Sequence, residues 1–222
     1  MGRTMFHVKQ FLWIVVCIVC FTACGGVPQP TLTAAAIPAG WQPLAQTGFS
    51  LAMPPTWEVL SPEDADLSGG LAAAAQANAP LGEALSQAQA SLAAGQLRVV
   101  AYDLNPDAET DALTNFSVGV LPAEGATLAQ LRTANLAQLR GMAQVADIAD
   151  QAAVVGGLPA AQWRYTLQVN AADGVASPRA IVQYLVVQRT EQYLLTFSST
   201  PSSTTTLAPV FQQVVDTLRF TE

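Results

Sequence analysis

Oxygen-bearing side chains recur at alternate positions between residues 103 and 109 (DLNPDAE). Carboxylate and amide oxygens at the first, third and fifth positions of a short loop are ligands that Ca²⁺ takes from proteins. The segment follows the strand-like run LRVVAYDL, so these side chains are expected where a strand ends. We therefore predict a weak calcium site whose ligands are Asp103, Asn105, Asp107 and Glu109.

Two departures leave a second interpretation of this segment open. Ala108 stands where the sharp turn of a calcium loop requires glycine, and Thr114 stands where the bidentate glutamate belongs. Asn105-Pro106 is also a turn signal in its own right. A solvated acidic loop without a metal is thus the favoured interpretation, and calcium binding is the weaker hypothesis.

Most other catalytic chemistry lacks its side chains in this sequence. The only histidine is His7 and the only lysine is Lys9, both ahead of the position at which we expect the chain to be cleaved. Ser-His-Asp triads, Ser-Lys dyads and zinc sites built on His and Cys are therefore excluded from the mature chain. A hydrolase that uses two carboxylates stays open, with Glu58, Asp103 and Asp216 as candidates.

The amino terminus carries a secretory pattern. Arg3 and Lys9 precede an unbroken apolar stretch, residues 11–21 (FLWIVVCIVCF), which is too short for a bilayer core that needs about 20 residues. The segment Phe21-Thr22-Ala23-Cys24 resembles the lipobox of bacterial lipoproteins, although such motifs more often carry leucine in place of Phe21. The resemblance implies that a diacylglycerol is attached to Cys24 and that the chain is cleaved before it. An ordinary secretory signal and an uncleaved anchor are the alternatives.

This pattern divides the chain into three parts. Residues 1–23 are the predicted lipoprotein signal peptide, and residues 24–40 hold the lipidated Cys24 and an uncharged, proline-rich tether. Residues 41–222 have the length of one domain. The other cysteines fall in the signal, so the mature chain has no internal disulfide. We expect a domain on the extracytoplasmic side of the cell membrane, held to the bilayer through acylated Cys24.

The charge of the mature chain restricts its partners. Its basic residues are seven arginines, and they stand against sixteen acidic residues, a net charge of −9. An acidic surface repels nucleic-acid phosphates and anionic lipid headgroups. We therefore expect no nucleic-acid partner, and we expect contact with the membrane through the lipid rather than through a basic patch.

The hydrophobic pattern predicts alternating groups of strands and helices. Strands are expected on both sides of a Thr47-Gly48 turn, and two Ala-rich helices in residues 65–94, with Gly95 as their stop. A helix capped by Thr127 is expected to run to about Gln144, and a last helix carries an apolar face from Leu207, after a Ser/Thr-rich loop and cap. The remaining strands are expected at residues 97–104, 115–121, 145–155, 161–169, 179–189 and 193–199, with Thr190-Glu191-Gln192 closing the last hairpin.

Successive hairpins imply an antiparallel sheet, and helices with one apolar face must cover it, so the predicted class is α+β in a single domain. The order of short segments resembles the PsbP-like family, named for an extrinsic subunit of photosystem II. The segments are GFSL at 48–51 with Pro55 and Trp57, NFSV at 115–118, GLPA at 157–160, QY at 183–184, YLLTF at 193–197 and FQQVVDTLRF at 211–220. The resemblance implies an α/β/α sandwich and no particular activity. The Ala-rich insert at 65–94 departs from it.

Three functions stay open at the level of sequence. The first is a non-enzymatic lipoprotein that binds a protein partner or stabilises an envelope complex, and it predicts an exposed apolar patch. The second is a small-ligand module, which needs a deep apolar pocket. The third is the carboxylate hydrolase, which needs two facing acids. Trp41, Trp57 and Trp163 are candidates for an aromatic binding platform, although the alternating pattern around Trp163 indicates a core position.

Overall fold

The computed structural model describes residues 36–60, 69–77, 79–105, 107, 110, 112–170 and 176–221. These residues belong to one compact unit, Leu32–Glu222. The predicted signal peptide, Cys24, most of the predicted tether and Glu109 lie outside the described residues. In the part of the chain that is described, no helix has the length and apolarity to cross a bilayer.

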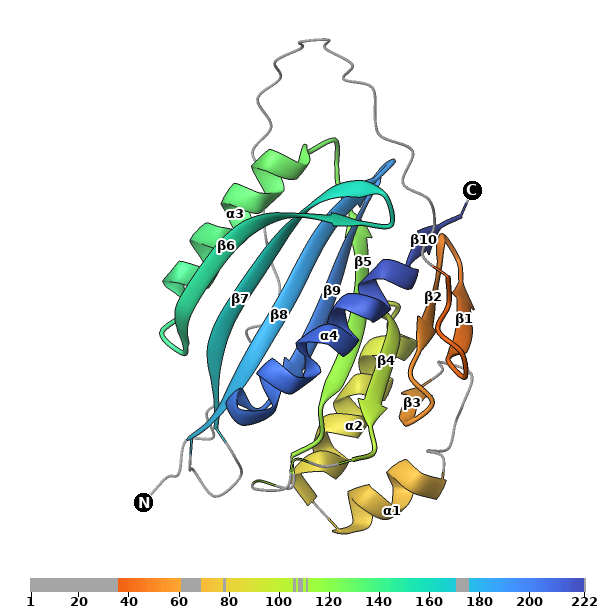
Figure 1. Cartoon of the computed structure of the whole chain (residues 1–222). Coiled ribbons are helices and arrows are strands. Elements are labelled where there is room, and N and C mark those ends of the chain that lie inside the picture. The colour runs from red at the N-terminus through yellow and green to blue at the C-terminus, as the bar shows by residue number, and fades with distance from the viewer. Residues whose placement is uncertain are drawn as a thin grey trace. The chain divides into compact units, whose positions relative to one another are not determined.

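The described elements form two antiparallel sheets and four helices, in agreement with the α+β prediction (Figure 1). The three-stranded sheet has the order β1-β2-β10, and the seven-stranded sheet has the order β3-β4-β5-β9-β8-β7-β6. The strands are β1 (Gln42–Gln46), β2 (Phe49–Met53), β3 (Trp57–Leu60), β4 (Leu97–Asp103), β5 (Asn115–Pro122), β6 (Val145–Val155), β7 (Leu158–Asn170), β8 (Ala176–Gln188), β9 (Glu191–Ser199) and β10 (Arg219–Phe220). The helices are α1 (Gly69–Ala77), α2 (Ala79–Ala93), α3 (Leu128–Gly141) and α4 (Pro201–Thr217).

The main core lies between one face of the seven-stranded sheet and a layer made of α4 and β2. Phe197 of β9 packs between Phe116 and Phe211, with ring centroids 4.6 and 4.5 Å away, respectively. Each of these three rings is almost completely buried, and burial of a large apolar side chain stabilises a fold by about 1.5–3 kcal/mol. The aromatic stack therefore fixes α4 on the sheet.

The opposite face of the seven-stranded sheet carries two separate apolar clusters. Leu71 of α1 and Leu85 of α2 pack with Val100 and other residues of β3 and β4, so the Ala-rich helices cover this end of the sheet, as expected. Further along, α3 covers β7 and β8 through Leu131 and Leu139. Trp163 lies fully buried beneath α3, which confirms its predicted core position.

Capping residues explain where two of the helices begin, and the observed helix bounds correct two expectations. Thr127 and Gln130 form the capping box that starts α3, but the helix ends at Gly141 instead of about 144, because Met142 has an extended backbone. The Ser/Thr-rich segment is helical rather than a loop, since Thr200 caps α4 and Pro201 occupies its first turn.

Two features near the carboxyl terminus also differ from the expectation. The β8–β9 turn consists of Arg189 and Thr190 alone, with Arg189 at φ 55°, and Glu191 and Gln192 already belong to β9. After α4, β10 pairs Phe220 with Phe49 of β2, an element that two residues are too few to predict.

Candidate functional site

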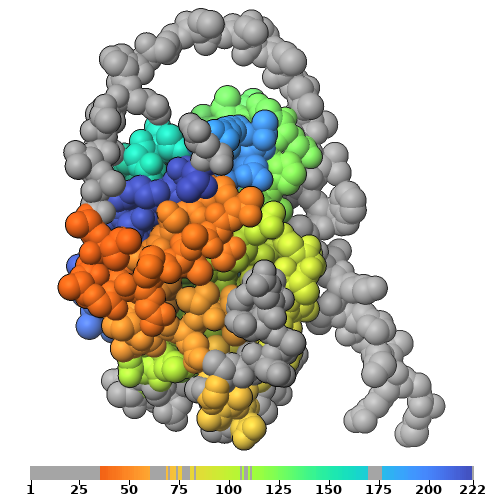
Figure 2. All heavy atoms as spheres, turned by 90° about the vertical axis from the view of Figure 1, so that its right-hand side faces the viewer, coloured from red at the N-terminus to blue at the C-terminus, as the bar shows by residue number. Residues whose placement is uncertain are grey.

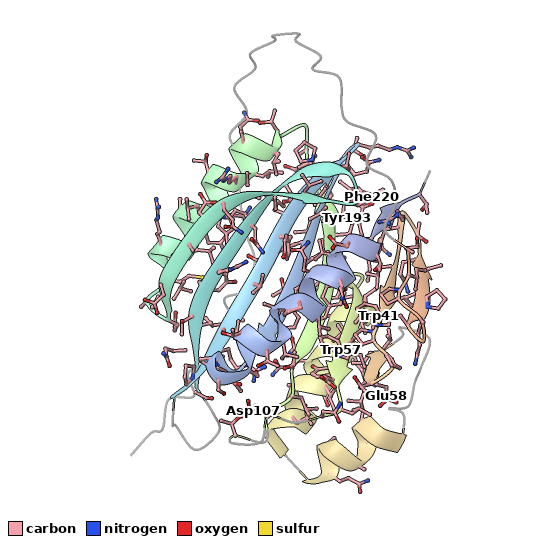
Figure 3. All side chains as sticks on the ribbon, in the orientation of Figure 1. Trp41, Trp57, Glu58, Asp107, Tyr193 and Phe220 are labelled. Carbon is pink, nitrogen blue, oxygen red and sulfur yellow. The ribbon has the colours of Figure 1, made fainter. Side chains whose placement is uncertain are left out.

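The structure places three of the four predicted calcium ligands, Asp103, Asn105 and Asp107, in contacts within the chain itself. Asp103 Oδ1 accepts hydrogen bonds from the backbone N–H and the side-chain amide of Asn105, at 3.1 and 3.0 Å. Asp107 Oδ2 accepts one from the Thr200 hydroxyl at 2.7 Å and one from the Ser202 hydroxyl at 3.2 Å. Asp107 thus ties the acidic loop to the start of α4, a structural role that the spacing of the acids did not reveal (Figure 3).

A half-buried arginine stands close to the same loop. Arg179 donates to the backbone carbonyls of Leu113 and Ser198, at 2.7 and 3.0 Å. Burial lowers the pKa of Arg179, while the negative charge of Asp107 opposes that shift. No group of three or more His, Cys, Asp or Glu side chains gathers among the described residues. Glu109 is outside those residues, and calcium binding by this segment stays a prediction.

The three acids considered for a hydrolase do not meet in one cleft. Glu58 pairs with Tyr102 across β3 and β4, whereas Asp103 pairs with Trp57. Successive residues of a strand point to opposite faces, so Glu58 and Asp103 project from opposite sides of the sheet. Asp216 lies on the exposed side of α4 and accepts a hydrogen bond from Gln212.

The large exposed apolar side chains are spread over the domain. Ile37 precedes β1, Leu104 follows β4, and Val154 and Val169 lie near opposite ends of the β6–β7 hairpin. Of the tryptophans, Trp57 and Trp163 are buried, and Trp41 is half-buried against the main core. Within the described residues, neither the expected apolar patch nor an aromatic platform is formed.

A cleft of about 460 Å³ lies along β3, at one end of the seven-stranded sheet. Its wall is made mostly of the consecutive residues 55–59 (PTWEV), and Gln42 of β1 and Leu104 complete it. Figure 2 faces this side of the domain, where β1, β2 and β3 lie above α1. A wall of consecutive residues means that the cleft follows the edge of a strand.

Glu58 gives this cleft its chemistry. Its Oε2 atom is shielded from solvent and has no hydrogen-bond partner among the residues that the structure describes. Its neighbour Trp57 points to the other face, where it meets Phe211 of α4 edge-on with ring centroids 6.5 Å apart (Figure 3). A shielded carboxylate without a partner is costly, because water no longer stabilises its charge fully. The cleft can therefore favour a cation or a hydrogen-bond donor.

Sequence reasoning missed this cleft for a physical reason. Glu58 was considered only as one of several carboxylates, because the wall opposite it depends on how β1 approaches β3. The available signal was the Pro54-Pro55 pair before a short strand, since proline is typical of strands at a sheet edge.

Comparisons with known proteins give similar folds at low sequence identity. No family profile matches the sequence, and no curated protein matches it. A cyanobacterial PsbP (CyanoP) from Synechocystis sp. has 14% identity and a TM-score of 0.48, with 90% of this chain and 98% of that chain covered. LpqN of Mycobacterium tuberculosis, involved in cell envelope biogenesis, has 14% identity and a TM-score of 0.48, with 82% and 91% covered.

The Ran-binding protein Mog1p of Saccharomyces cerevisiae has 10% identity and a TM-score of 0.46, with 81% of this chain and 95% of that chain covered. A PsbP is thus among the solved structures similar to this chain, in line with the resemblance drawn from the sequence. At these identities and TM-scores, the similarities do not indicate what this chain binds.

Proposed function

We propose that this chain is a lipid-anchored extracytoplasmic lipoprotein whose domain binds a protein partner and is not an enzyme. Partner binding is supported by the cleft along β3. This cleft lies at a strand edge and is lined by Glu58, whose Oε2 has no hydrogen-bond partner among the described residues. Protein partners commonly use such edges, because main-chain hydrogen bonds supply affinity and side-chain pockets supply specificity.

The anchoring part rests on the sequence alone. A short basic leader, an apolar stretch of eleven residues and Cys24 after small residues together support lipidation. Attached acyl chains hold a protein to a bilayer by about 0.8 kcal/mol for each buried methylene, so two or more chains give a durable anchor. Such an anchor would keep the domain near membrane-bound partners.

The anchor is tested by changing its attachment atom. We expect the wild-type chain in the membrane fraction and a mature amino-terminal peptide whose mass carries a lipid at Cys24. A Cys24→Ala variant should lose the lipid and leave the membrane fraction. An unmodified Cys24 peptide in the wild type, or equal fractionation of the two proteins, would refute the anchor.

Partner binding is tested with a photo-cross-linking amino acid placed in the cleft. Thr56 is exposed and lines the cleft, whereas Gln151 is exposed on β6, at the other end of the sheet. In intact cells we expect a discrete cross-linked protein from position 56 and none from position 151. Cross-links of equal yield from both positions, or none from position 56, would contradict binding at the cleft.

Binding of a small ligand is the alternative interpretation of the same cleft. Its volume lies within the range of about 300–1,000 Å³ that is usual for small-molecule sites. The lining does not fit such a site well, because the largest apolar ring, Trp57, is only 3% exposed and turns toward the core. Absence of a protein cross-link from position 56 would favour this reading.

A further inference from the structure

The outer edge of β3 offers unused backbone groups. The Leu104 N–H donates to the Thr56 carbonyl at 3.3 Å, and alternate residues of an antiparallel strand bond to the same neighbour. The backbone groups of Glu58 and Leu60 therefore turn toward β4, and those of Trp57 and Val59 turn outward. The Trp57 N–H donates to Pro54, at 3.0 Å. This leaves the Trp57 carbonyl and both polar groups of Val59 without a backbone partner among the described residues.

The cleft leads directly to these groups. Its wall includes Trp57, Glu58 and Val59 in sequence, and no strand of the described chain lies on the outer side of β3. An edge of this kind is a template on which another extended chain can add a strand. A guest strand would bond twice to Val59 and once to the Trp57 carbonyl.

The charge of the cleft selects among extended chains. Glu58 lies between the two outward-facing residues, and its carboxylate has one oxygen, Oε2, without a hydrogen-bond partner in the described part of the chain. Because Glu58 lines the cleft, its carboxylate could accept a charge-assisted hydrogen bond from an ammonium or a guanidinium group there. The mature chain contains no lysine and carries a net charge of −9, so its overall field also favours a cationic guest.

We infer that the partner supplies an extended segment, which adds to β3 as a strand and places one arginine or lysine on Glu58. The inference rests on the proposed function, because it specifies the chemistry of the partner at the same cleft. Main-chain bonds would set the position of the segment, and the single cation would set its register. A compact amine would use Glu58 but not the Val59 groups.

A competition between synthetic peptides tests both parts of the inference. The full-length lipoprotein is immobilised in detergent and exposed to equimolar mixtures of blocked pentapeptides, random except at the centre. One mixture has central arginine, one has central citrulline, and one has central arginine with a methylated backbone nitrogen. Citrulline removes the charge with little change of shape, and the methyl group removes a strand hydrogen bond. Mass spectrometry of the retained peptides gives the ratios.

We expect arginine peptides to be retained about tenfold over citrulline peptides, as charge-assisted bonds imply, and over the N-methylated peptides as well. A Glu58→Gln variant should remove the preference for arginine over citrulline and keep the discrimination against N-methylation. An Asp147→Asn variant, which removes an exposed acid from β6, should keep both preferences.

Equal retention of arginine and citrulline peptides, or of methylated and unmethylated ones, would overturn the inference. The same holds if Glu58→Gln leaves the arginine preference intact. If position 56 cross-links a protein while no peptide is retained, the proposed partner binding stands and the basic-strand inference is wrong. If arginine peptides are retained but position 56 cross-links nothing, the proposed function fails and the inferred partner segment falls with it.

Discussion

The two edges of the seven-stranded sheet are built differently. β6 has eleven residues, and a bulge between Ala146 and Ala149 interrupts its pairing with β7. Asp147 in that bulge has φ 55°, and Asp150 forms a salt bridge with Arg132 of α3. β3 has four residues, regular pairing with β4 and a cleft along its outer side.

This difference shows how one sheet can protect one edge and leave another open. Bulges and charged side chains on a long edge strand hinder pairing with a second chain. β3 limits unwanted pairing by its short length alone, and its regular backbone can still accept a short guest strand. This difference agrees with the proposal that a partner binds at β3 and not at β6.

The largest expected effect is on stability, and it compares how firmly β3 and β6 are attached to the core. Trp57 on β3 is buried, whereas Val154 on β6 is 52% exposed. A Trp57→Ala change should lower the free energy of unfolding by about 3–5 kcal/mol, because it leaves a cavity beside Phe211. Val154→Ala should change it by less than about 0.5 kcal/mol. Denaturant unfolding measures both, and similar losses would mean that β3 is not the firmly attached edge.

Alkaline pH should weaken the sheet one strand in from each edge. Burial raises the pKa of Tyr102 on β4 and that of Tyr165 on β7 to about 12, from 10.0. The pKa of each hydroxyl is higher in the folded state than in the unfolded state. The stability of the fold is therefore unaffected by these groups below pH 10, and it falls as the pH rises from 10 through about 12. Above that pH, the buried hydroxyl of each tyrosine should lower the free energy of unfolding by about 3 kcal/mol.

The measurement is the midpoint of alkaline unfolding, with phenolate absorbance recorded in parallel. Tyr102→Phe and Tyr165→Phe should each move unfolding to higher pH. Phenolate formation near pH 10 in the folded protein would contradict the burial of these side chains.

A smaller effect tests how the β6 edge is held. Gly156 and Gly157 form the two-residue turn between β6 and β7, at φ 57° and 83°, as hairpins of this type require. A Cβ atom at Gly156 would lie 2.8 Å from the Phe220 ring, whereas one at Gly157 would meet open space. Gly156→Ala should cost about 2–3 kcal/mol and Gly157→Ala about 1 kcal/mol. Equal costs would show that β10 does not restrain the β6 hairpin.

The smallest effect concerns the salt bridge on the protected edge. Arg132 and Asp150 are 2.9 Å apart and are 35% and 22% exposed, respectively. An Arg132→Ala change should therefore reduce stability by about 0.2–1 kcal/mol, less at high salt. The same change should leave peptide retention at β3 unaltered. A larger loss of stability would mean that the salt bridge, rather than the bulge, shapes the β6 edge.

Much of the fold could be predicted because it depends on neighbouring residues. Alternating apolar residues predicted most of the strands, and Thr127 with Gln130 marked the start of α3. The predicted start of α4 was too late in the chain. Serine and threonine favour both loops and helix caps, so the Ser/Thr-rich segment alone did not show that the helix already begins after Thr200. β10 was missed, since two residues carry no periodicity.

The candidate site could not be predicted in the same way. Asp107 accepts a hydrogen bond from the hydroxyl of Thr200, a residue far along the chain, and the spacing of Asp107 from Asp103 carried no sign of that contact. Glu58 was one acid among sixteen until the sheet order placed it at an edge.

The sequence by itself determined most of the element types, the prediction of a lipid anchor, and the acidic, lysine-free character of residues 24–222, because periodicity, motif and charge need no long-range contact. Only the tertiary structure decided which strands end the sheet and which acids keep free oxygens. Those properties arise from pairing between distant segments, such as β5 with β9 and β2 with β10, and no local pattern encodes them.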